Sequence, residues 1–99
     1  MAHSVTLSWI ASTTPGISGY NIYRGNNPPG NEGATPINSA IVTGLTYVDT
    51  NVTAGEKVDY VLTSVLNGVE SIHSAEVTAT IPVTQADVNP PTGVTAVAL

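Results

Sequence analysis

The sequence predicts an all-β protein in which short strands form two sheets packed face to face. Charged residues make up only 9% of the 99 residues. The chain is instead rich in Thr, Ser, Val, Asn and Gly, a balance that favours strands and turns over surface helices. Apolar and polar residues alternate in several short segments, and Gly, Asn and Pro separate these segments at regular spacing. The length is that of one ordinary domain.

The first strand expected from this pattern covers residues 4–10, where the string SVTLSWI alternates strictly. One face of the strand is apolar and the other is made of Ser and Thr, as in a half-buried strand. We expect Trp9 to be almost fully buried between the two sheets. The inward residues of this strand are Val5, Leu7 and Trp9.

A second strand is expected over residues 20–24, after a turn-forming segment. Tyr20 and Ile22 would face the core in it, whereas Tyr23 would point outward. The loop that follows, from Gly25 to Pro36, is rich in Gly, Asn and Pro and is too polar to form a core of its own.

The longest alternating run covers residues 58–65 and predicts a central strand. The pair Asn67-Gly68 follows and predicts a tight hairpin, because both residues accept a positive φ. A further strand is expected over residues 76–81. Shorter apolar runs lie at 37–42 and 45–48. In the central strand the inward residues are Val58, Tyr60, Leu62 and Ser64, and the outward residues are Asp59, Val61, Thr63 and Val65.

A resemblance to a known family is carried by the strings VTLSW, GYNIYR, TYVDTNVTAGEKVDYVLTSV and NGVESIHSAEVTATIP. Together they resemble a fibronectin type III domain of the kind found in bacterial extracellular proteins. The resemblance implies a seven-stranded immunoglobulin-like sandwich with Trp9, Tyr20 and Ile22 in its core. The family's corner tyrosine, whose hydroxyl bonds back to the preceding loop, is replaced by Val58.

The order of the strands departs from the family pattern at both ends. The family's first strand should precede VTLSW by several residues, yet this chain begins almost at the second strand. We expect the sandwich, strands two to seven, to cover residues 4–82 and a linker to cover 83–90. The segment 91–99, PTGVTAVAL, resembles the family's first strand. The chain therefore resembles a repeat cut out of phase, with its first strand at the C-terminus.

Composition and motifs exclude several classes of function. The formal net charge is −5, with only two basic residues, which argues against binding nucleic acid or an anionic membrane surface. No apolar run is long enough for membrane insertion. The chain has no cysteine, and His3 lies far from His73, so we expect no metal site.

No catalytic or cofactor-binding residue is predicted. The sequence contains no nucleophile elbow and no glycine-rich segment that leads into a helix. The carboxylates lie in turns or at outward positions, where we expect them to be solvated surface charges rather than an acid/base pair. We therefore expect a protein that is not an enzyme and has no cofactor. The carboxylates considered are Glu32, Asp49, Glu56, Asp59, Glu70 and Glu76.

The resemblance implies a non-catalytic structural or interaction module of a larger extracellular or cell-surface protein, whose partners are neighbouring domains or copies of itself. The alternative is a carbohydrate- or protein-binding module that uses the loop 25–36 or a candidate partner face. This face consists of Tyr23, Val61 and Val65, which outward alternation would expose as one apolar patch. The other interpretation is that these three are ordinary apolar surface residues without a partner, which are common in proteins.

The segment 91–99 alternates as a strand does, and a sandwich without its first strand leaves an open edge. We expect head-to-tail donation of this segment to a neighbouring copy. A strand of about eight residues spans about 27 Å, and the connection 83–90 could extend to roughly 26–29 Å, so closure within one molecule would need a taut linker. The alternative is a misplaced chain boundary and an unpaired segment. The candidate donor residues are Thr92, Val94, Ala96 and Ala98.

Overall fold

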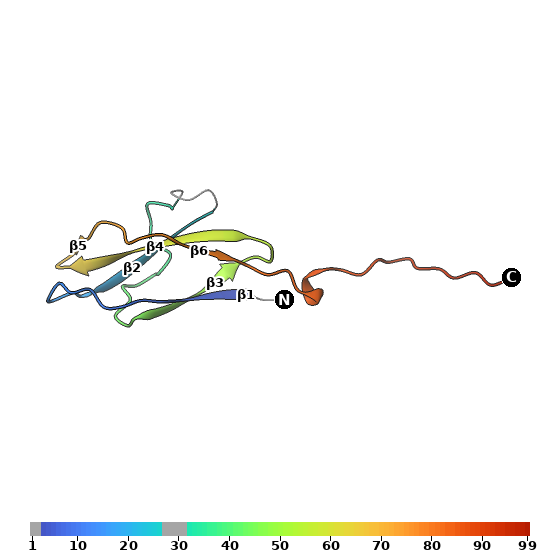
Figure 1. Cartoon of the computed structure of the whole chain (residues 1–99), viewed down its shortest axis with the longest axis horizontal. Helices are drawn as coiled ribbons and strands as arrows, with labels where there is room; N and C mark the ends of the chain where they lie inside the picture. Colours follow the sequence, from blue (N-terminus) through green and yellow to red (C-terminus); the bar gives the residue numbers. More distant parts are fainter. Residues whose placement is uncertain (1–2, 27–31) are drawn as a thin grey trace.

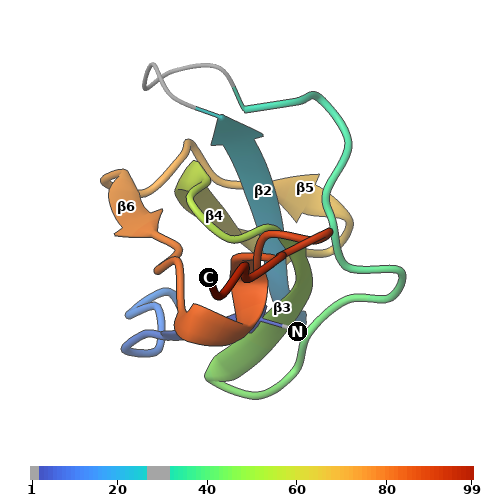
Figure 2. The same cartoon turned by 90° about the vertical axis from the view of Figure 1, so that its right-hand side faces the viewer.

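The computed structural model describes residues 3–26 and 32–99 and confirms a sandwich of two antiparallel sheets (Figure 1). Viewed along the long axis, β2 (Gly19–Asn26) and β4 (Lys57–Leu66) lie in one layer and β3 (Thr46–Val52) in the other (Figure 2). A short 3-10 helix, η1 (Gln85–Asp87), follows the last strand. The first sheet consists of β1 (His3–Ser8) and β3 (Thr46–Val52), and the second of β2 (Gly19–Asn26), β4 (Lys57–Leu66), β5 (Val69–Glu70) and β6 (Val77–Thr80).

The core lies between the sheets and is built from the inward positions of both. Ile22 on β2 and Val58 on β4 have no exposed surface, and Tyr60 and Tyr20 are also buried. The predicted inward direction of Tyr20 and Ile22 is therefore confirmed. Burial of these apolar side chains is the main force that holds the layers together. The central cluster consists of Leu7, Ile22, Val52, Val58, Tyr60 and Ile81.

The hairpin between β4 and β5 turns at the predicted pair, with φ of 51° at Asn67 and 79° at Gly68. Beyond β5 the chain leaves regular pairing with β4 and regains it only at β6. In this interval two serine hydroxyls accept hydrogen bonds from backbone N–H groups of β4. The Ser71 hydroxyl accepts the Ser64 N–H (2.9 Å) and the Ser74 hydroxyl accepts the Leu62 N–H (3.0 Å). The edge of this sheet is thus satisfied without a continuous strand.

The apolar run 37–42 lies along the other edge of the second sheet but forms no regular strand. The side chain of Asn38 takes the place of a backbone carbonyl there, because its Oδ1 accepts the Ile22 N–H (2.8 Å). A single bridge joins Tyr20 to Val42. The backbones of Gly19 and Val42 lie so close together that a Cβ on Gly19 would be 2.6 Å from the Val42 carbonyl oxygen. Only glycine fits at this position.

The expected almost complete burial of Trp9 is wrong. Trp9 is partly buried, with its ring 5.5 Å from that of Tyr20 and edge-on to it. Val77, which the alternation places inward on β6, is 51% exposed. Both residues border a groove between β1 and β6 that the described parts of the chain leave uncovered. These two side chains remain accessible because no strand among the described residues lies beside β1 on this side.

Candidate functional site

The outer edge of β1 is a free edge of the first sheet among the described residues. Within the described residues β1 pairs with β3 and with no other strand. The Trp9 N–H donates to the Leu45 carbonyl (3.0 Å) on the β3 side. Because hydrogen-bonded positions alternate along an antiparallel pair, the N–H and C=O groups of Thr6 and Ser8 point to the opposite, free edge. Such an edge is able to accept an added strand.

A groove of about 580 Å³ runs beside this edge, and its walls come from both sheets. The β1 side contributes Trp9 and Ile10, and the other side contributes Ile72 and Val77. The two isoleucines are among the most exposed apolar residues, at 93% for Ile10 and 91% for Ile72. An apolar groove next to unpaired backbone groups has the chemistry of an empty strand position.

The C-terminal segment 88–99 extends away from the sandwich as an unpaired chain (Figure 1). The molecule consequently measures 79 Å along its long axis and only 24 and 20 Å across. The four candidate donor residues all lie in this segment and are exposed within one molecule. They are Thr92, Val94, Ala96 and Ala98.

One hydrogen bond fixes where this segment starts. The Nε2 of His3, at the beginning of β1, lies 2.8 Å from Oδ2 of Asp87 in η1. Asp87 also accepts the backbone N–H and the hydroxyl of Thr84, and these bonds, with the backbone bond the largest contribution, lower its pKa to about 2. The tail therefore leaves from the pole where β1 begins and extends away from the sandwich (Figure 1).

The candidate partner face is not exposed. Tyr23, Val61 and Val65 are only 5%, 4% and 7% exposed, so the expected apolar surface patch is wrong. The Tyr23 hydroxyl donates to Glu70 (2.6 Å), and its ring lies 5.4 Å from that of His73. Side chains of the same molecule thus cover the outer face of the second sheet. Burial, together with Glu70, raises the pKa of Tyr23 to about 12.

The other surface considered for a ligand, the loop 25–36, lies partly outside the described residues. Its described ends are Gly25 on β2 and the segment from Glu32 to Pro36. An isolated bridge joins Gly25 to Glu32, which closes the base of the loop. Nothing in these described ends forms an aromatic platform for a sugar.

A buried polar cluster ties the two sheets together, and sequence patterns did not reveal it. Asp49 on β3 is 4% exposed and receives Arg24 Nη1 from β2 (2.7 Å) and the Tyr60 hydroxyl from β4 (2.7 Å). The Tyr60 hydroxyl thus joins the second sheet to β3 of the first sheet. The charge of Asp49 is compensated by Arg24 and by the hydroxyl.

This cluster makes stability depend on pH. Burial alone would raise the pKa of Asp49, but bonds from Arg24, Tyr60 and the Asn51 backbone outweigh it and hold the pKa below 3.8. Because the folded pKa is below the unfolded one, the stabilisation is complete above the unfolded pKa and is lost as the pH falls through the folded pKa.

We expect Asp49→Asn to cost about 1.5–3 kcal/mol at neutral pH, since charge-assisted hydrogen bonds are lost. This difference from the parent should shrink as the pH falls below the ordinary pKa of an aspartate and through the lowered pKa of folded Asp49, because the parent then loses the same charge. Denaturant titrations of both proteins over this pH range provide the measurement. A difference that stays constant or grows on acidification would contradict the assignment.

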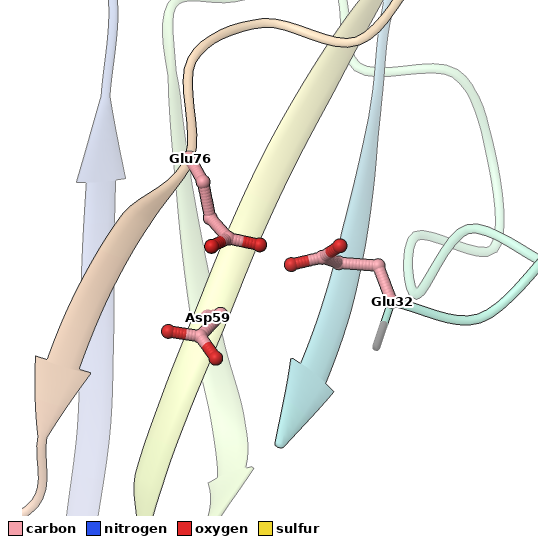
Figure 3. A group of neighbouring side chains, drawn as sticks. All are labelled: Glu32, Asp59 and Glu76. Atoms are coloured by element: carbon pink, nitrogen blue, oxygen red, sulfur yellow. The ribbon is translucent and has the colours of Figure 1, made fainter. Parts of the chain in front are cut away.

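Three carboxylates that the sequence places on the surface converge on the outer face of the second sheet (Figure 3). They are Glu32, Asp59 and Glu76, and their ligand atoms lie within 4.8 Å of one another. Sequence reasoning missed this group because its members come from three separate segments. The one available signal was Asp59 itself, a charged residue in the middle of the central strand.

Comparisons with known proteins agree with this architecture. The chain is 35% identical to a crystallised Fn3-like protein from Clostridium thermocellum, with a TM-score of 0.67, over 83% of this chain and 80% of that one. It is also 36% identical over 95 residues to Exoglucanase B of Cellulomonas fimi, of which it spans only 8%. No protein-family model matches the chain. The chain belongs to the Fn3-like family.

Proposed function

We propose that this chain is a non-catalytic structural module of a larger extracellular protein, and that its C-terminal segment pairs with the free β1 edge of the adjacent module. For the isolated chain the adjacent module is a second copy. In a longer polypeptide it is the repeat that follows. The match to a short stretch of Exoglucanase B supports the modular role. It also supports a location outside the cell, because an exoglucanase acts on a glucan polymer. Within the described residues no helix is long and apolar enough to span a membrane.

The single observation that carries the pairing proposal is the groove beside β1. It combines two features that a strand satisfies together, the unpaired backbone groups of Thr6 and Ser8 and the accessible apolar surface of Trp9 and Val77. The donor segment supplies a matching pattern. Its Val and Ala side chains on one face are small enough for a groove that Trp9 partly fills.

The direction of the tail favours a second copy as the recipient over the same molecule. The His3–Asp87 bond places the start of the tail at the pole where β1 begins. A strand antiparallel to β1 must start at the opposite pole. The tail would have to cross the whole sandwich before pairing with its own β1. It extends along the long axis instead, which is the direction in which a stacked copy would receive it (Figure 1). Head-to-tail contacts of this kind build linear assemblies.

We expect the mass of the full chain to increase with concentration, from about 5 to about 500 µM, in size-exclusion chromatography with light scattering. A chain truncated after Asn89 keeps the Asp87 contact and should stay monomeric over the same range. A full chain that is strictly monomeric at every concentration would contradict the proposal.

A matched variant tests the receiving edge without touching the donor. Thr6→Pro removes an N–H that points away from β3, and proline is tolerated at such edge positions. We expect Thr6→Pro to keep the melting temperature of the truncated chain within a few degrees and to abolish the concentration dependence. Assembly of the Thr6→Pro protein equal to that of the parent would show that the copies meet through another surface.

A further inference from the structure

A row of residues across the second sheet brings two carboxylates together over a glycine. Glu32 forms a bridge with Gly25 on β2, Gly25 lies opposite Asp59 on β4, and Asp59 lies opposite Thr78 on β6. Residues directly opposite in a sheet share a face. Because Gly25 has no side chain, the carboxylates of Glu32 and Asp59 can meet above it. Glu76, just before β6, points at the same space (Figure 3).

The central carboxylate is fully buried and incompletely satisfied. Asp59 is 0% exposed, and the Thr78 hydroxyl donates to its Oδ1 (2.5 Å). Its Oδ2 and the Oε2 of Glu32 are both buried, and neither has a hydrogen-bond partner among the residues described. Buried carboxylate oxygens are strongly unfavourable without a donor or a cation. The structure therefore holds acceptor atoms that aim at a common point and lack a ligand.

No basic side chain among the described residues is seen to pair with these buried carboxylate oxygens. In the described parts of the chain, Arg24 is bound to Asp49 on the inner face of the sheet, and His3 pairs with Asp87 at the pole where β1 begins. Lys57 precedes Asp59 by two residues on the same strand, yet it forms no ion pair within those parts. Three acidic groups in one place also repel one another, which favours an external positive charge.

We propose that Glu32, Asp59 and Glu76 form a calcium-binding site on the outer face of the second sheet. Carboxylate oxygens are the ligands that hard divalent cations prefer. Two ligand atoms on one ion are at most twice the bond length apart, about 4.6–5.2 Å for Ca²⁺ and about 4.2 Å for Mg²⁺. The spacing of up to 4.8 Å lies within the calcium limit. Thr78 holds the Asp59 carboxylate in orientation, as partners of metal ligands commonly do.

The test is thermal unfolding of the full chain in EDTA and in about 5 mM calcium chloride at matched ionic strength. We expect calcium to raise the melting temperature by about 5 °C or more, with half of the effect reached at about 0.1–1 mM, as in other extracellular modules. Magnesium at the same concentration should raise it less. An unchanged melting temperature in calcium, or a larger shift with magnesium, would overturn the proposal.

Single carboxylate variants test whether the calcium-induced rise in melting temperature comes from this cluster. Asp59→Asn keeps the shape and the Thr78 contact but removes a charge, so we expect it to melt at or above the parent temperature in EDTA and to lose the calcium shift. Glu76→Gln gives the same readout if Asp59→Asn fails to fold. Glu70→Gln, a carboxylate outside the cluster, is the matched control and should keep the full shift. A full shift in both cluster variants, or its loss in Glu70→Gln, would place the ion elsewhere.

Discussion

Replacing Asp49 with alanine is expected to lower the free energy of unfolding by about 3–5 kcal/mol, because it leaves the partners of a buried charge uncompensated. Arg24 and the Tyr60 hydroxyl both bind this carboxylate at 2.7 Å. A loss of this size is a large share of the total stability of a small domain. Chemical denaturation followed by Trp9 fluorescence gives the measurement.

Tyr60→Phe is the matched comparison for Asp49→Ala. It removes one hydroxyl and keeps both the ring in the core and the Arg24–Asp49 pair, so we expect a smaller cost of about 1.5–3 kcal/mol. Equal losses in the two variants would mean that the ion pair between the sheets adds little. A loss below about 1 kcal/mol for Asp49→Ala would contradict its role as the polar tie between β3 and the second sheet.

The second large effect is expected for Ile22→Ala, at about 2–5 kcal/mol. Ile22 is 0% exposed and lies in the central cluster between the layers, so alanine leaves a cavity as well as less buried apolar surface. Ile10→Ala makes the same chemical change at a residue that is 93% exposed. In the isolated monomer it should alter stability by less than about 0.5 kcal/mol.

The same pair of variants separates folding from assembly. Ile10 lines the groove beside β1, so Ile10→Ala should weaken association of the full chain while leaving the stability of the truncated chain unchanged. A comparable loss of stability for Ile22→Ala and Ile10→Ala in the truncated chain would show that the assigned layers are wrong.

Alternation was sufficient to predict the core strands. It placed Ile22, Val58 and Tyr60 inward, and all three are buried. Period-two patterns succeed here because each strand has one face against the other sheet. The tight turn at Asn67-Gly68 was equally predictable, since few residues accept a positive φ.

The exposed fraction of a side chain was harder to predict than the face of the sheet to which it points. Trp9 and Val77 point inward as expected but keep accessible surface, because burial also depends on a strand that the pattern of one segment cannot supply. Tyr23 points outward as expected but is covered, because Glu70 and His73 come back over it from a distant part of the chain. Both differences arise from contacts between segments rather than from local sequence.

The polar sites were the least predictable part. Asp49 and Asp59 looked like ordinary surface carboxylates, and their environments exist only once β2, β3, β4 and β6 have come together. For Asp59, the glycine opposite it on the neighbouring strand creates the space that Glu32 reaches, and strand register cannot be read from a single sequence.

Amide hydrogen exchange at Thr6 and Ser8 tests strand pairing at the β1 edge most directly. Both N–H groups point to the free edge, so they should exchange rapidly in the chain truncated after Asn89 and become protected in the full chain as its concentration rises. The Leu7 amide, on the β3 side by the same alternation, should be protected in both chains. Rapid exchange of Thr6 and Ser8 in the concentrated full chain, equal to that in the truncated chain, would contradict pairing at this edge.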